Sequence, residues 1–182
     1  MLVNALIGLA IVIALLVALV ATRPAGFRVA RSTTIDAQPD VVFAQVNDFH
    51  HWDVWSPWAK LDPNSKATFN GPASGKGAHF HWSGNKQVGE GSMRIVDSQP
   101  TDRIGIQIEF VRPFKATNDV EFTFKPVGDQ THVTWAMSGK NNFMFKAFSL
   151  FMSCDKMLGG QFEIGLANMK SLVESSESPA QA

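Results

Sequence analysis

His79 and His81 stand two positions apart in a segment where they alternate with the aromatic residues Phe80 and Trp82. On a strand, this spacing directs both imidazoles to one face, as a pair of metal ligands requires. No acidic residue or histidine at a recognisable spacing completes a third ligand, and inward-facing aromatic residues would leave both histidines in water. The histidines at 50–51 have no better partners. We therefore expect neither a metal site nor a cofactor.

General acid or base catalysis has few candidates. His81 and Glu90 are the candidate proton carriers, with Arg94 and Asp155 as further ionisable residues, and no spacing forces any two of them into contact. The chain has no tyrosine to act as a phenolic proton donor, and Cys154, its single cysteine, has no neighbouring histidine to activate it. This inventory favours binding over catalysis.

Three tryptophans, Trp52, Trp55 and Trp58, recur at three-residue steps. They could form a belt at a membrane surface, because indoles favour the lipid headgroup zone. Alternatively, they wedge a loop onto the domain core, since each indole buries a large apolar area. We favour the second interpretation.

The composition indicates one folded domain with an appendage. The chain has 182 residues, of which 45% are hydrophobic, and its 16 basic residues balance 16 acidic ones. Without a net positive charge or a basic block, the chain lacks the counterion-release driving force of nucleic-acid binders. A single cysteine excludes an intrachain disulfide framework. Nucleic acid is therefore not an expected partner.

The appendage is the amino-terminal segment. Over residues 2–21 the only polar side chain is that of Asn4, and no charge precedes Arg23. A helix over this run covers about 30 Å, the thickness of the hydrocarbon layer of a bilayer. Two other interpretations of this segment are less favourable. Cleavage at its end, as in a secretory signal, would place the large Leu19 at the minus-three site, where small residues are preferred. A buried helix of the domain core would be shorter or less uniformly apolar. We predict an uncleaved, single-pass transmembrane anchor at residues 1–22.

Basic residues follow this segment and none precedes it. Arg23, Arg28 and Arg31 lie on its carboxy-terminal side. Because basic residues concentrate on the cytoplasmic side of membrane proteins, we expect the following domain to be cytoplasmic. The linker, residues 23–26, is short, so the domain should stay beside the bilayer.

The domain begins with a predicted strand over 27–35, which has one apolar face on which Arg31 is a misfit. Asp36 is the expected N-cap of a short helix that has Pro39 in its first turn and ends near 47–48. A second short helix or loop carries the three tryptophans.

Turn signals divide residues 66–137 into a series of antiparallel strands. The clearest strands, 104–110, 120–125 and 132–137, have apolar residues at every second position. One face of the resulting sheet is therefore continuously apolar and must be covered.

A carboxy-terminal amphipathic helix that ends near residue 174 supplies the predicted cover, and Asp155 is placed to cap it. A further apolar segment, 143–152, precedes it. Residues 175–182 lack an apolar anchor and are expected to form a disordered tail.

Several motifs, together with the order of the elements, resemble a known superfamily. The motifs are Val29-x-Arg31-Ser32-x-x-Ile35, Pro39-x-x-Val42-Phe43, Trp52-x-x-Trp55-Ser56-Pro57-Trp58, Asp62-Pro63, Trp82-Ser83-Gly84-Asn85, Val88-Gly89-x-Gly91-x-Met93-x-Ile95, Thr131-x-Val133-Thr134-Trp135 and Phe162-Glu163-x-Gly165-Leu166-x-Asn168-Met169-Lys170. Over about residues 27–174 the chain resembles the START-related SRPBCC superfamily with its helix-grip fold, in particular the polyketide cyclase/dehydrase and lipid-transport group. It also resembles bacterial members that carry a membrane anchor.

The resemblance implies an α+β fold in which a curved antiparallel sheet wraps around a long carboxy-terminal helix. Two short helices follow the first strand, and an amino-terminal transmembrane helix precedes the 27–174 domain. A hydrophobic cavity between sheet and helix would hold the ligand, whereas a dry, close-packed core is the alternative. The expected ligand-lining residues are Phe80, Trp82, Met93, Ile95, Ile106, Ile108, Phe110, Phe122, Phe124, Val133, Trp135, Met137, Phe162, Leu166 and Met169.

These expectations describe a membrane-anchored binding protein for a lipid or another apolar small molecule. Two alternatives stay open. A polyketide cyclase/dehydrase-like enzyme would use the same cavity with His81 or Glu90 as a proton carrier. A protein-interaction module would instead show an exposed apolar patch and a collapsed interior.

Overall fold

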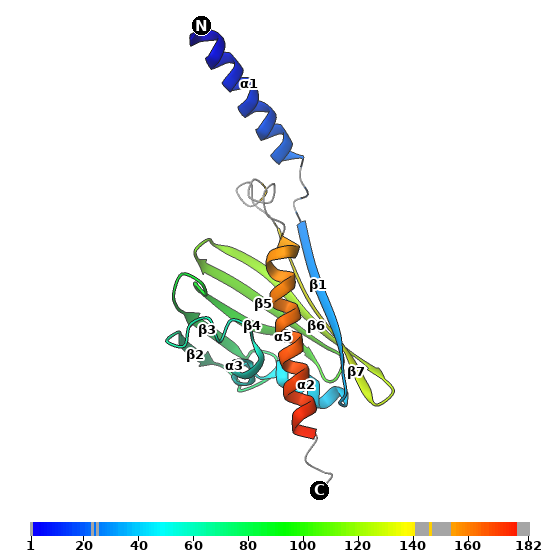
Figure 1. The fold of residues 1–182 in the computed structure, drawn as a ribbon. Coiled ribbons are helices and arrows are strands. Elements are labelled where there is room, and N and C mark those ends of the chain that lie inside the picture. Colours follow the sequence, from blue (N-terminus) through cyan, green and yellow to red (C-terminus); the bar gives the residue numbers. More distant parts are fainter. Residues whose placement is uncertain (1, 23, 25, 141–145, 147–153, 178–182) are drawn as a thin grey trace.

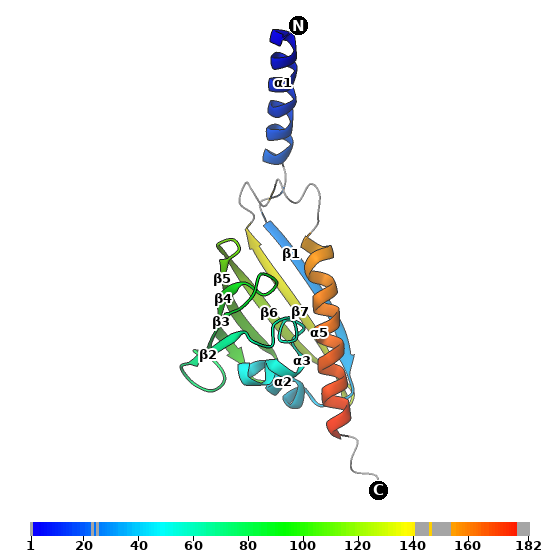
Figure 2. The ribbon, with the colours of Figure 1, turned by 60° about the vertical axis from the view of Figure 1, so that its left-hand side comes forward.

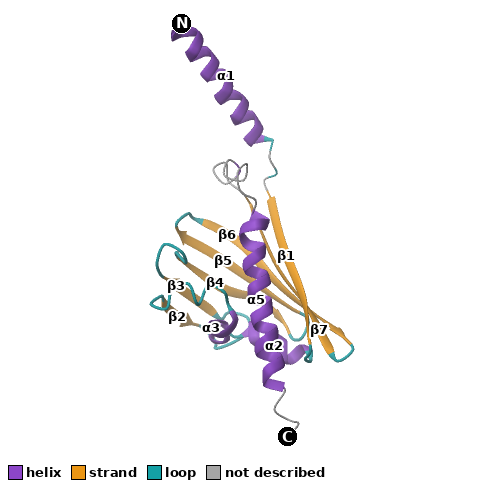
Figure 3. Ribbon diagram, viewed as in Figure 1, coloured by secondary structure: helices purple, strands orange, loops and turns teal. Residues whose placement is uncertain are grey.

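The computed structural model describes residues 2–22, 24, 26–140, 146 and 154–177. Figures 1 and 2 show a helix, α1, standing apart from a domain in which a large sheet faces a long helix, α5. Figure 3 shows the shorter helices lying at one end of this sheet. The elements are α1 (Leu2–Ala21), β1 (Gly26–Ile35), α2 (Pro39–Asn47), η1 (Phe49–His51), α3 (Trp52–Trp55), β2 (Lys66–Asn70), β3 (His79–Ser83), β4 (Glu90–Gln99), β5 (Arg103–Arg112), β6 (Ala116–Val127), β7 (Gln130–Lys140) and α5 (Cys154–Glu177).

The described strands form one antiparallel sheet of seven in the order β1-β7-β6-β5-β4-β3-β2. The predicted meander is confirmed, and β1 pairs with the last strand, so that Val29 lies opposite Met137. Two register irregularities in β4, at Glu90/Gly91 and Ile95/Asp97, interrupt its pairing with β5, and such irregularities bend a sheet. A curved sheet that faces a long carboxy-terminal helix fits the predicted helix-grip fold.

The amino-terminal helix α1 carries large apolar side chains in exposed positions, among them Val3 and Leu15, each 65% exposed. When only the residues with described side chains are considered, no helix is both long enough and apolar enough to cross a membrane. The predicted anchor also includes Leu2 and Ala5, whose side chains lie outside the described residues, as does Arg23 of the linker. Membrane anchoring and the cytoplasmic placement stay predictions.

The helix α2 has Pro39 in its first turn and ends where the sequence predicts, but its predicted N-cap is wrong and it begins later than that cap implies. Gln38, not Asp36, precedes the first helical residue, and its side chain makes no capping hydrogen bond. The reason is Pro39, because a residue before proline is held in an extended conformation, as Gln38 is at φ −68° and ψ 152°.

The carboxy-terminal helix extends beyond its predicted end. Ser175 and Ser176, predicted to begin the tail, continue α5, and their hydroxyls donate to the carbonyls of Leu172 and Val173. Residues 178–182 lie outside the described residues, as does most of the predicted apolar segment 143–152.

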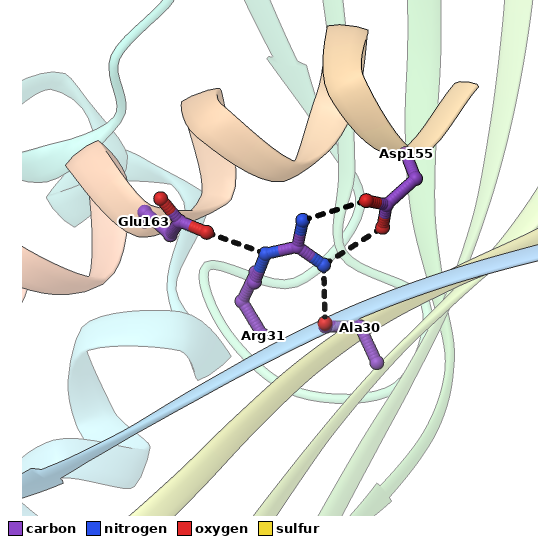
Figure 4. Close-up of polar contacts among 4 residues, drawn as sticks. All are labelled: Ala30, Arg31, Asp155 and Glu163. Atoms are coloured by element: carbon purple, nitrogen blue, oxygen red, sulfur yellow. Dashed lines mark hydrogen bonds and ion pairs between the residues drawn. The ribbon is translucent and has the colours of Figure 1, made fainter. Parts of the chain in front are cut away.

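Arg31, the misfit on the first strand, fastens the start of α5 to β1 (Figure 4). Its Nη1 and Nη2 donate to the two carboxylate oxygens of Asp155 at 2.8 and 3.0 Å, and its Nε donates to Glu163 at 2.6 Å. These hydrogen bonds lower the pKa of Asp155 and raise that of Arg31. Gly159 lies against the guanidinium, where any Cβ would collide with it. We call this group the Arg31 clamp.

A second set of contacts fastens the end of α5 to the same strand. Lys170 Nζ donates to the carbonyl of Thr34 at 2.6 Å, and the backbone N–H of Asp36 donates to Glu174 at 2.9 Å. Lys170 and Glu174 also pair at 2.7 Å, and this hydrogen bond, with that from Asp36, lowers the pKa of Glu174. Both ends of α5 are therefore held along β1, at one edge of the sheet.

Candidate functional site

Two of the three tryptophans fix the segment that follows α2 onto the core. Trp52 and Trp55 are buried, and their Nε1 atoms each donate at 3.1 Å to a backbone carbonyl, those of Val46 and Gln45. The prediction that the tryptophans wedge a loop onto the domain core is confirmed for this pair. The loop that continues from α3 is therefore held over the inner face of the sheet.

An aromatic cluster lies where this loop, the sheet and α5 meet. The ring of Trp135 on β7 stacks between Phe122, at a centroid distance of 4.9 Å, and Phe162 of α5, at 4.2 Å. Trp55 and Trp58 meet it edge-on, at 5.6 and 5.8 Å. Trp58 is only half-buried. The cluster closes one end of the space between sheet and loop.

Beside this cluster lies a cavity of about 530 Å³. Its floor comes from the inner face of β2 to β7, its roof from α3 and the loop over 56–65, and one side from Leu158 of α5. Most of its lining is aromatic or aliphatic. The lining residues are Phe49, Trp52, Asp53, Ser56, Trp58, Ala59, Asp62, Pro63, Ser65, Ala67, Phe80, Trp82, Gln87, Val88, Met93, Ile108, Phe110, Arg112, Pro113, Val120, Trp135, Met137 and Leu158.

The predicted ligand-lining residues divide into two groups. One group lies on the cavity wall: Phe80, Trp82, Met93, Ile108, Phe110, Trp135 and Met137. The other group is buried in close packing away from the cavity: Ile95, Ile106, Phe122, Phe124, Val133, Phe162, Leu166 and Met169. The strand residues of both groups face inward, as the alternation predicts. That a ligand contacts the first group stays a prediction.

Sequence reasoning missed most of the roof. Trp52 and Trp58 were expected to pack on the core, and their three-residue spacing gave no sign that they also border a cavity. Leu158 lies on the apolar face of α5, one turn before Phe162, and helical periodicity could have identified it. Asp53 and Arg112 carried no recognisable signal.

Hydrogen bonds at the cavity rim hold its loops. Asp62 accepts from the backbone N–H of Asn64 at 3.1 Å and from that of Asn85 at 2.7 Å. Arg112 Nε donates to Glu90 at 2.8 Å, and its Nη2 donates to Ser83 at 3.2 Å. The charged groups of Asp62 and Arg112 are thus already engaged by the protein.

The position of Trp82 on the cavity wall is also fixed. Its Nε1 donates to the carbonyl of Val88 at 3.0 Å. Gly91 lies directly beneath its ring, where a Cβ would come within 2.6 Å of Trp82. Gly89 has a positive φ of 67°, which favours glycine, and it lies against the carbonyl of Arg112. These glycines serve turn formation and close packing.

The candidate proton carriers come near each other, but neither lines the cavity. His81 Nε2 lies 3.8 Å from a carboxylate oxygen of Glu90, which also binds Arg112. His81 lies on the outer face of the sheet, because Phe80 and Trp82, its neighbours on β3, take the inner one. Glu90 lies on the same face of β4 as Ser92, the residue opposite His81. The thiol of Cys154 lies outside the described residues.

His50 is bound to residues close to it in the fold. Asp48 accepts hydrogen bonds from the backbone N–H and the ring of His50 at 2.9 and 2.6 Å. Burial raises the pKa of Asp48, but these hydrogen bonds outweigh it and the net shift is downward. The His50 ring stacks on Phe69 at 4.0 Å. Within the described part of the chain, no three His, Cys, Asp or Glu residues are grouped to hold a metal ion.

Comparison with known proteins agrees with this geometry. Residues 26–174 match the model of the family described as "Polyketide cyclase / dehydrase and lipid transport". Among curated proteins, none matches the chain.

Solved structures resemble the fold at low sequence identity. Protein CV1439 from Chromobacterium violaceum is 14% identical with a TM-score of 0.58, covering 84% of this chain and 99% of that one. The Aha1 dimer from Colwellia psychrerythraea is 14% identical with a TM-score of 0.59, covering 81% and 96%. CalU16 from Micromonospora echinospora is 19% identical with a TM-score of 0.57, covering 87% and 82%. At these identities the likeness concerns the fold alone.

Proposed function

The chain belongs to the polyketide cyclase/dehydrase and lipid transport family, and from this premise we propose that it binds an apolar small molecule or lipid. The ligand would lie in the cavity between the sheet, the loop over 56–65, which we call the roof loop, and α5. The single observation that carries the proposal is the cavity itself. Its volume of about 530 Å³ falls among those of small-molecule sites, which are typically about 300–1,000 Å³ and mostly apolar.

The chemistry of the wall supports binding rather than a reaction. The polar groups of Asp62 and Arg112 are occupied at the rim, so removal of apolar ligand surface from water supplies most of the affinity. His81 and Glu90 lie off the wall, which leaves the enzyme alternative without a placed proton carrier. The interaction-module alternative requires a collapsed interior, which the cavity does not provide.

The proposal includes membrane anchoring through α1. Its exposed apolar side chains, such as Val3 and Leu15, would be covered by lipid, and the arginines that follow favour a domain on the cytoplasmic side. A ligand that partitions into the bilayer would then be concentrated near the cavity. Retention of the full chain in carbonate-washed membranes tests the anchor, and its release into the wash would refute it.

Filling the cavity tests the binding function. Val120 lines the cavity from β6, whereas Val127 lies on the same strand with 53% of its side chain exposed. Native mass spectrometry of the full chain, released from detergent, should show a bound apolar molecule in the wild type. Val120→Phe should reduce its occupancy at least about tenfold, because a phenyl ring needs the space that the ligand uses.

The matched control is Val127→Phe, which adds the same ring outside the cavity and should retain the bound molecule. Lipid bound to α1 would survive both substitutions, so only a loss specific to Val120→Phe counts as support. A wild-type chain that carries nothing, and takes up nothing from a panel of fatty acids and sterols, would refute the binding function.

A further inference from the structure

The hairpin that joins β5 to β6 exposes apolar side chains to solvent. Phe114 is 69% exposed, the largest fraction among the large apolar side chains that the structure describes, and Val111 is 45% exposed. Both lie in one short segment, residues 111–115, that is exposed throughout. We call this segment the 111–115 hairpin. Single exposed apolar residues are common, but neighbouring ones at one site indicate a contact surface.

The 111–115 hairpin also borders the cavity. It contributes Arg112 and Pro113 to the lining, and the neighbouring turn over 84–89 contributes two further residues. The turns between strands that contribute none, all within the described part of the chain, are 71–78, 100–102 and 128–129. The cavity is therefore displaced toward one end of the sheet.

The pairing of the strands shows that this is the end to which α1 is attached. Gly26, the first residue of β1, lies opposite Lys140 of β7, and the preceding residue of β7 lies opposite Asn118, near the start of β6. The 111–115 hairpin leads into β6 at the same end. Figures 1 and 2 show the turn between β5 and β6 at the end of the sheet nearer to α1.

A short linker keeps this end of the sheet close to α1. The helix ends at Ala21 and β1 begins at Gly26, so at most about 18 Å of extended chain separates them. With α1 as the proposed membrane anchor, the lipid headgroups lie within this distance of the start of β1. A bilayer is therefore the surface that α1 brings to the exposed hairpin.

Charge distinguishes the two ends of the sheet. The two turns that border the cavity carry the exposed lysines Lys86 and Lys115 and no acidic residue. Of the three turns at the other end, two carry Asp102 and Asp129, and the third carries Lys76. Lysines beside exposed apolar side chains favour contact with a bilayer that contains anionic lipids. The charge therefore matches an anionic bilayer at the cavity end.

We propose that the 111–115 hairpin is a second membrane contact, which holds the rim of the cavity against the bilayer. Phe114 and Val111 enter the headgroup zone beside α1. Lys115, together with Lys86 of the neighbouring turn, faces the lipid phosphates. The ligand then passes from the bilayer into the cavity without crossing water. This inference rests on the proposed function and specifies the source of the ligand.

A depth probe on the full chain tests this contact. In a Cys154→Ser background, a single cysteine that carries the fluorophore NBD is introduced by Phe114→Cys or, as the matched control, by Val127→Cys. Val127 is 53% exposed in the hairpin at the opposite end of the sheet. In vesicles of phosphatidylcholine and phosphatidylglycerol, NBD at position 114 should emit at shorter wavelength and be quenched by lipids with a headgroup nitroxide. NBD at position 127 should show neither change.

Charge variants test the part of the lysine. In the chain labelled at position 114, Lys115→Glu should reduce the quenching in vesicles with phosphatidylglycerol more than in phosphatidylcholine alone. Lys125→Glu makes the same change at an exposed position of β6 toward the other end, and it should leave the quenching unchanged. Equal effects of the two variants would overturn the role of Lys115.

Ligand uptake tests what the contact does. Deuterated fatty acids and sterols are added to vesicles that hold the full chain, and native mass spectrometry follows their appearance in the protein over time. Phe114→Ser should slow the uptake and leave the final occupancy unchanged, because the cavity itself is intact. Val127→Ser removes an equally apolar side chain from the other end and should change neither value.

The outcomes separate this inference from the proposed function. If NBD at positions 114 and 127 responds alike while the chain stays with the vesicles, the hairpin contact is overturned and the anchor stands. If Phe114→Ser and Val127→Ser take up ligand at equal rates, delivery from the bilayer is overturned. If the wild type takes up none of the probes, the binding function fails, whereas the depth probe still decides the hairpin contact.

Discussion

The two halves of β5 look alike in sequence and differ in what covers them. Ile104 and Ile106, at one half, are 0% and 1% exposed. Ile108 and Phe110, at the other half, continue the same inward alternation but line the cavity, and Phe110 is only half-buried. The packed half and the cavity half therefore differ in the elements laid over them.

The cover explains the difference. Over the packed half lie α2 and its neighbours, whose Phe43 meets Phe124 of β6 edge-on at 5.3 Å. The cavity half is roofed by the loop that follows α3, because both ends of α5 are fastened along β1 at the far edge of the sheet. A helix held at one edge leaves room at the other. The fastening of α5 is thus as important for the cavity as the residues that line it.

The largest expected effect contrasts the two halves by the same substitution. Ile106→Ala in the packed half should lower the free energy of unfolding by about 3–4 kcal/mol, because it removes contacts on all sides and leaves a void. Ile108→Ala should cost about 1–2 kcal/mol less, since its side chain already borders open space and has fewer contacts to lose.

Urea unfolding of the full chain in one detergent, followed by tryptophan fluorescence, measures both values. Equal losses would mean that the cavity half is packed as tightly as the other half. Saturation with a cavity ligand should bring the cost of Ile108→Ala closer to that of Ile106→Ala, because the ligand then fills the space beside Ile108.

Alternation at every second residue was enough to predict which side chains face inward, because it follows from strand geometry alone. It could not distinguish Ile106 from Ile108, since their covering elements come from distant parts of the chain. Arg31 was recognised as a misfit, but its partners Asp155 and Glu163 lie 124 and 132 residues away. No local pattern connects residues at such separations.

The roof loop was unpredictable for a similar reason. Its position depends on Asp62, which binds the backbone of Asn85 in the turn between β3 and β4, 23 residues away. Asp62-Pro63 was noticed as part of a motif, yet its contact could not be derived from the residues. The fold thus follows from repeating patterns, whereas the cavity depends on single long-range contacts.

A second prediction tests whether the Arg31 clamp holds α5 at the β1 edge of the sheet. Gly159 and Gly160 are adjacent in α5, but a Cβ at Gly160 meets nothing within 4 Å, whereas one at Gly159 collides with the Arg31 guanidinium. Gly160→Ala should raise the free energy of unfolding by up to about 1 kcal/mol, because alanine favours helix over glycine. Gly159→Ala should gain less or lose stability, since Arg31 must move.

The Arg31→Met background provides the control for this prediction. Without the guanidinium, Gly159→Ala should recover the gain seen at Gly160, as measured by the same urea unfolding. If Gly159→Ala is equally stabilising in both backgrounds, the Arg31 clamp does not hold α5.

The smallest expected effect is the pH dependence of the same fastening. Hydrogen bonds from Arg31 hold the pKa of Asp155 below its ordinary 3.8, and those from Lys170 and Asp36 hold that of Glu174 below 4.5. A carboxyl with a lowered pKa stabilises the fold above its unfolded-state pKa, and this contribution is lost as pH falls through the folded-state value. Stability should therefore decline as pH drops below about 4.5.

Substitution separates the contributions of Asp155 and Glu174 to this decline. Arg31→Met should flatten the part below about pH 3.8 that belongs to Asp155 and leave the part from Glu174, because the two sites share no partner. Arg28→Met, on an exposed position of the same strand, should leave the unfolding profile unchanged. Because Asp155 lies at the start of α5 and Glu174 near its end, Arg31→Met should speed hydrogen exchange near Leu158 more than near Glu174. Hydrogen exchange along α5 of the wild type and the variant measures this difference, and an equal increase along the whole helix would show that the two sites do not act separately.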